Sequence, residues 1–146
     1  MTILYTIETD KYTIQLIRDA DPKMNRTSRV HIWNSEKLSE LAPLEAALPT
    51  PKEKGEDPEN DKAYDTYNRT YIKVQKRIAD EVVAKLLEDK HIKTFGDDEK
   101  VTFRFSRYAG CGMCACSPGV VVSTRLYWKS EYDTYVLVDV HISVKI

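Results

Sequence analysis

The segment 135–146 reads YVLVDVHISVKI and carries the most regular alternation in this chain. Valine or isoleucine stands at every even position from Val136 to Ile146, and mostly polar residues stand between them. Successive side chains of a strand point to opposite faces, so this pattern predicts a strand with one apolar face and one polar face. Such a strand needs neighbouring strands for its backbone and a second layer for its apolar face.

Five other segments predict strands because they are rich in β-branched and aromatic residues and are bounded by turn residues. These segments are 3–7, 12–17, 29–33, 101–108 and 120–128. Asp10 and Lys11 are expected to turn the first two into a hairpin. The last three strands are expected to form an antiparallel meander whose final hairpin turns at residues 129–134.

Residues 57–91 predict one long amphipathic helix. Asp57 is a favoured N-cap, and Pro58 is favoured at the first helical position. Apolar residues then recur at helical spacing: Tyr64, Tyr67, Tyr71, Val74, Ile78, Val82 and Leu86. Leucines in 38–48 predict a short helix limited by Pro43. The expected fold is α+β: an antiparallel sheet of about five to six strands with one long helix packed on a face and a short second helix.

Length and composition predict a single cytoplasmic domain, 1–146, with a mobile surface loop at 49–57. The chain has 22 Lys and Arg against 23 Asp and Glu, which argues against a general nucleic-acid binder. No apolar run approaches the ~20 residues that span a bilayer, and the N-terminus lacks the pattern of a signal peptide. The three crowded cysteines do not form a secreted disulfide framework, so we expect reduced thiols.

All three cysteines lie in one short loop: Cys111, Cys114 and Cys116, with the spacing C-x2-C-x-C. Thiolates are favoured zinc ligands, and a structural zinc site needs four ligands. If the final hairpin turns at 129–134, residues 141–146 lie opposite residues 117–122, and His141 reaches the loop. The sequence therefore predicts zinc on these cysteines and His141. This zinc would hold the loop and shape a binding surface without chemistry of its own.

Three other interpretations of the cysteine loop remain open at this point. An iron–sulfur cluster needs an external fourth ligand, because the chain has no fourth cysteine. A catalytic thiolate at Cys116 would use His141 and Asp139 in a Cys-His-Asp set. The loop can also be a tight turn in which cysteines pack as small apolar residues or form an adventitious disulfide.

Arginines near this loop form a second candidate site. Arg104 and Arg125 are expected on one face of adjacent strands, with Arg107 beside the loop. Guanidinium groups bind anionic ligands or a nucleic-acid backbone. The equally weighted alternative is cross-strand pairing with carboxylates, for which the candidates are Glu131, Asp133 and Asp139.

The stretch 110–119, GCGMCACSPG, resembles the Cys-rich CxCSPG loops of small uncharacterised proteins from bacteriophages and bacteria. The resemblance covers about ten residues and implies no activity. It does imply a phage-encoded accessory protein that acts on a host partner in the host cytoplasm. We therefore expect a small metal-binding accessory or interaction protein with a protein partner. The rival classes are a Cys-dependent or metal-dependent enzyme and a nucleic-acid or nucleotide binder.

Overall fold

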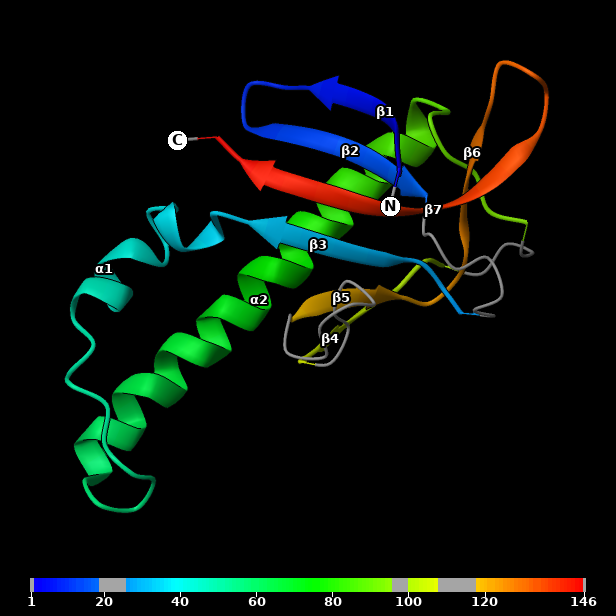
Figure 1. The fold of residues 1–146 in the computed structure, drawn as a ribbon. Coiled ribbons are helices and arrows are strands. Elements are labelled where there is room, and N and C mark those ends of the chain that lie inside the picture. Colours follow the sequence, from blue (N-terminus) through cyan, green and yellow to red (C-terminus); the bar gives the residue numbers. More distant parts are fainter. Residues whose placement is uncertain (1, 19–25, 96–99, 108–117, 146) are drawn as a thin grey trace.

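The computed structural model describes residues 2–18, 26–95, 100–107 and 118–145 of the chain. A seven-stranded sheet is crossed on one face by a long helix, which confirms the α+β class (Figure 1). The strands are β1 (Thr2–Glu8), β2 (Tyr12–Arg18), β3 (Arg29–Trp33), β4 (Phe103–Ser106), β5 (Gly119–Val122), β6 (Leu126–Lys129) and β7 (Tyr135–Val144). The helices are the 3-10 turn η1 (Ser35–Lys37), the short α1 (Ala42–Ala46) and the long α2 (Pro58–Glu88).

The alternating segment 135–144 forms β7, an interior strand of the sheet. The order is β1-β2-β7-β3-β5-β4, and β6 pairs with the first half of β7. The predicted hairpin at 129–134 is confirmed, because Leu126 lies opposite Val138 and Lys129 opposite Tyr135. The predicted β1–β2 hairpin is also confirmed. The pairing of β3 with β7 is parallel, so the sheet is mixed, whereas an antiparallel sheet was expected.

The predicted strand over 120–128 is two strands in the structure. It divides into β5 and β6 around residues 123–125. β6 pairs with β7, but β5 leaves that hairpin and pairs with β3 and β4. Because β3 lies between β5 and β7, the expected pairing of residues 117–122 with residues 141–146 is wrong. Pairing between β5 and β7, which the predicted zinc site required, therefore does not bring His141 to the cysteine loop.

The core lies between the sheet and the second half of α2. The even-numbered residues of β7 from Val138 onward are at most 4% exposed and share one buried cluster with α2. On α2 the main members of this cluster are Val74, Ile78, Val82 and Leu86. Burial of one such side chain stabilises the fold by roughly 1.5–3 kcal/mol. The odd-numbered residues of β7 therefore face the other side of the sheet.

The first half of α2 extends past the sheet (Figure 1). The Asp57 side chain caps the helix by accepting a hydrogen bond from the Glu59 N–H, as its position predicted. The segment 49–57 contains no helix or strand, and two of its carbonyl groups accept hydrogen bonds from α2 side chains, Tyr64 and Asn60. Within the described ranges no helix is long and apolar enough to span a membrane.

Candidate functional site

Two histidines meet on the sheet face that lies opposite α2. The parallel register of β3 and β7 places His31 directly beside His141. Their ring centroids are 5.3 Å apart, and the rings are nearly perpendicular. Trp33, two residues further along β3, lies with its ring 4.9 Å from that of His141. The result is an imidazole pair with a half-exposed indole at its rim.

His31 also touches the strand that follows the cysteine loop. A Cβ atom at Gly119 would lie 3.0 Å from His31 Nδ1, so glycine leaves the space that the imidazole fills. The His31 ring makes a hydrogen bond to the backbone of Pro118. Because proline has no N–H, the acceptor is its carbonyl oxygen. His31 is thus held at the point where residues 118 and 119 enter β5.

Both imidazoles are held in their neutral form. Burial lowers the pKa of His141 to about 4, and a positive charge on His31 would lower it further, while Asp139 opposes the shift. Burial also lowers the pKa of His31, with Asp139 and the Pro118 carbonyl opposing. At neutral pH each ring therefore keeps a lone pair, which is the form that binds metal ions.

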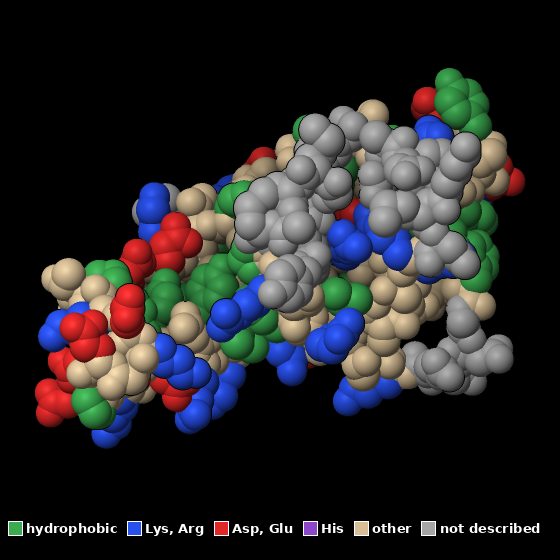
Figure 2. Space-filling view, turned by 60° about the horizontal axis from the view of Figure 1, so that its bottom comes forward, with side chains coloured by type: hydrophobic (Ala, Val, Ile, Leu, Met, Phe, Trp, Pro, Cys, Tyr) green, Lys and Arg blue, Asp and Glu red, His purple; other side chains and the backbone are tan. Residues whose placement is uncertain are grey.

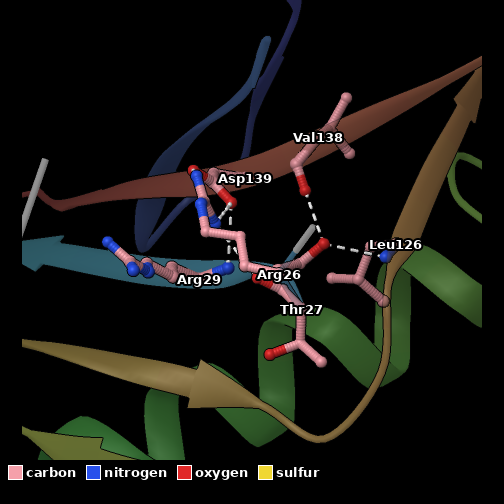
Figure 3. A network of polar contacts seen from close by, with 7 residues as sticks. Arg26, Thr27, Arg29, Leu126, Val138 and Asp139 are labelled. Atoms are coloured by element: carbon pink, nitrogen blue, oxygen red, sulfur yellow. Dashed lines mark hydrogen bonds and ion pairs between the residues drawn. The ribbon is translucent and has the colours of Figure 1, made fainter. Parts of the chain in front are cut away.

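Asp139 faces the same side of the sheet, but its carboxylate is already engaged (Figure 3). Arg26 Nη1 and Nη2 donate to its two oxygens at 3.0 and 2.6 Å, and the Arg29 backbone N–H donates at 2.9 Å. The described residues give no hydrogen bond between Asp139 and His141. The third member of the predicted Cys-His-Asp set therefore serves an ion pair and does not orient the imidazole.

A buried serine explains why the predicted 120–128 strand divides. Ser28 Oγ donates to the Val138 carbonyl at 2.7 Å and accepts from the Leu126 N–H at 2.8 Å. Its backbone carbonyl accepts from Val122, and its N–H donates to Thr124. The chain at 123–125 thus bends at Ser28, from β5, which pairs with β3, to β6, which pairs with β7 (Figure 3).

The structure does not gather the three candidate arginines into one patch. Arg104 is exposed on β4 opposite Val121, because Phe103 and Phe105 point to the core. Arg107 lines a groove of about 730 Å³ along α2. Arg125 lies beyond the end of β5, in a hollow of about 290 Å³ beside Tyr127. The expected common face of Arg104 and Arg125 is therefore absent from the described sheet.

Two of the three acidic partners considered for these arginines bind other cations. Asp133 pairs with Lys129 and Asp139 pairs with Arg26. Figure 2 shows basic and acidic side chains intermingled over the overhanging end of α2, where the Arg107 groove also contains Asp61 and Asp65. This mixture gives the groove no single sign of charge, so it does not resemble a phosphate-binding surface.

The predicted thiolate ligands, Cys111, Cys114 and Cys116, lie outside the described residues. Within the described part of the chain, no three potential ligands gather into one group. His141 is linked to the end of the loop through His31, not through strand pairing with residues 117–122. The sequence offered one signal for His31: like His141, it stands at an odd, polar position of an alternating strand.

Comparisons with protein-family models, with curated proteins and with solved structures found no match for this chain.

Proposed function

We propose that the protein is a small metal-binding interaction protein that holds zinc with His31, His141 and thiolates of the C-x2-C-x-C loop. The imidazole pair beside Pro118 and Gly119 is the observation that supports this proposal. Two imidazoles on one tetrahedral zinc have ring centroids about 5 Å apart, since each Zn–N bond is about 2 Å. The observed separation of 5.3 Å fits that geometry.

The sequence supports the thiolate half of the site. Cys116 stands two residues before Pro118, whose carbonyl accepts the His31 hydrogen bond. A ligand imidazole that donates its other N–H to a carbonyl is the usual way in which proteins fix the ring and its tautomer. With two histidines available, a four-coordinate zinc requires only two of the three cysteines.

The surroundings of the imidazole pair favour a structural role with a protein partner. Trp33 is 47% exposed and packs against His141, and tryptophan is enriched at protein interfaces. Zinc at this place would fix the loop beside Trp33 and so shape a surface. The likeness of residues 110–119 to phage and bacterial loops extends the proposal to a phage-encoded accessory protein whose partner is a host protein.

Metal analysis of protein purified without added metal tests the proposal. We expect about one zinc per chain, and tetrahedral Co²⁺ should replace it with visible bands from thiolate and imidazole ligands. The double variant His31→Ala with His141→Ala should lose this metal. His91→Ala is the matched control: His91 lies against Tyr5 beyond the end of α2, so its loss should leave the metal content unchanged.

Two outcomes contradict the zinc proposal. A metal-free protein that binds neither Zn²⁺ nor Co²⁺ removes the site. Stoichiometric iron with sulfide, after purification without oxygen, replaces it with the iron–sulfur alternative. The fluorescence of Trp33 gives an independent measurement, since Co²⁺ at the adjacent imidazoles should quench the indole.

A further inference from the structure

In the described part of the chain, β1, β4 and β6 lie at edges of the sheet. The edges of β6 and β4 are protected against pairing with another chain. The outer edge of β6 is covered by Lys93, whose backbone exchanges hydrogen bonds of 2.8 and 2.9 Å with Tyr127. β4 is four residues long and carries the exposed Arg104. Short length, charge and covering segments are the usual protection of an edge against pairing with another chain.

β1 is the edge that lacks this protection. It is seven residues long, and its sequence from Thr2 to Ile7, TILYTI, contains no charge, glycine or proline. Ile3 is 55% exposed and Tyr5 is 41% exposed. An uncharged segment rich in β-branched and aromatic residues is the type that pairs readily with another strand.

The C-terminal part of the β1 backbone, Tyr5–Glu8, is suitable for such pairing. One irregularity interrupts the register with β2, between Ile3 and Tyr5, and Tyr5–Glu8 then follows a regular antiparallel register. In Figure 1, β1 lies at the rim of the sheet, and no described strand pairs with its outer side. Among the described residues, none pairs with the outward N–H and C=O groups of β1, which a partner strand could therefore bind.

We propose that β1 pairs antiparallel with β1 of a second copy of this chain, which joins two sheets across a two-fold axis. A second copy suits this edge because TILYTI brings no like charges together when it meets itself. The flanking Glu8 is paired with Lys145 at 2.7 Å, and antiparallel pairing places the two Glu8 side chains at opposite ends. The exposed Ile3 and Tyr5 gain cover from apolar residues of the partner strand.

The size of this interface predicts a weak dimer. The regular part of β1, Tyr5–Glu8, extends over about 14 Å, and such a strand pair stays below the ~1,200 Å² of a standard interface. We therefore expect a dissociation constant on the order of 10–100 µM. The chain would be a monomer in dilute solution and a dimer at high protein concentration.

Sedimentation equilibrium of the full chain, with a chelator and a thiol reductant present, tests this proposal. The mass should rise from 16.8 kDa toward twice that value as the concentration passes through the micromolar range. Thr6→Lys adds a charge to the exposed side of β1 and should weaken the dimer at least tenfold. Tyr132→Lys is the matched control, since it adds the same charge at an 81% exposed aromatic in the turn after β6.

The thermal midpoint of Thr6→Lys should match that of the unchanged protein, which shows that the fold persists. The proposal is overturned if the chain stays monomeric at several hundred micromolar. It is also overturned if a dimer forms that Thr6→Lys leaves intact. Chelation keeps this result separate from the zinc proposal, because the edge contains no metal ligand.

Discussion

The polar side chains on the sheet face opposite α2 make two different kinds of contact. Asp139 binds Arg26 and the Arg29 N–H, and both partners of the ion pair are largely buried, with 12% and 15% side-chain exposure. His31 and His141 have each other, a carbonyl and an indole as neighbours. The contacts of Asp139 hold β3 and β7 together, whereas the two neutral imidazoles keep lone pairs that a ligand can use.

The Asp139 pair is expected to matter for stability. Asp139→Asn should lower the free energy of unfolding by about 2–4 kcal/mol, because it removes the carboxylate charge that both terminal nitrogens of the largely buried Arg26 bind. Asp133→Asn is the control: its pair with Lys129 is exposed, so its loss should leave the free energy of unfolding almost unchanged. Urea unfolding measures both, and equal effects of the two changes would contradict this account.

The neutral state of His141 gives the metal-free protein a defined pH dependence. Its pKa is about 4 in the fold and about 6.5 when unfolded, so the unfolded chain binds more protons between these values. The stabilisation is therefore complete above about pH 6.5 and is lost as the pH falls toward 4.

Urea unfolding with a chelator at about pH 7 and pH 5 measures this effect. The unchanged chain should lose roughly 1 kcal/mol more than His141→Gln on acidification, after allowance for the partial exposure of the ring. An equal loss in both proteins would show that this imidazole is not held neutral by the fold.

Among the elements, α2 shows what a helical sequence pattern predicts about burial and what it does not. Its stripe of apolar residues begins at Tyr64, but its buried apolar residues begin at Val74. Asp57 and Pro58 set the start of the helix through local backbone chemistry, and the structure confirms that start. The helical pattern could not show that the sheet covers only the second half, since this depends on the width and place of the sheet.

This division of α2 predicts two levels of local stability. Backbone amides of residues 62–72 should exchange with solvent much faster than those of residues 76–86, which hydrogen-exchange mass spectrometry resolves. Ile78→Ala should cost about 2–5 kcal/mol, because the side chain is fully buried. Ile72→Ala, in the first half of α2, is the matched control. An equal loss of unfolding free energy in both variants would contradict this difference between the two halves of α2.

At the scale of the whole molecule, strand order decides which groups meet. The sequence predicted the α+β class, both hairpins and the polar face of β7. It did not predict that β3 enters between β7 and β5, and it therefore placed His141 opposite residues 117–122. In the structure the neighbours of His141 are Gln15 on β2 and His31 on β3.

The sequence by itself determined the features that depend on near neighbours: the period of each strand, the cap of α2, the turn at 129–134 and the crowding of the cysteines in one loop. Tertiary structure alone decided the His31–His141 pair, the separation of Arg104 from Arg125 and the unprotected edge at β1. The physical reason is that alternation fixes the face on which a side chain lies, whereas its neighbours on that face come from strand order. Strand order is set by long-range contacts such as those of Ser28, which hydrogen-bonds to residues about a hundred positions away.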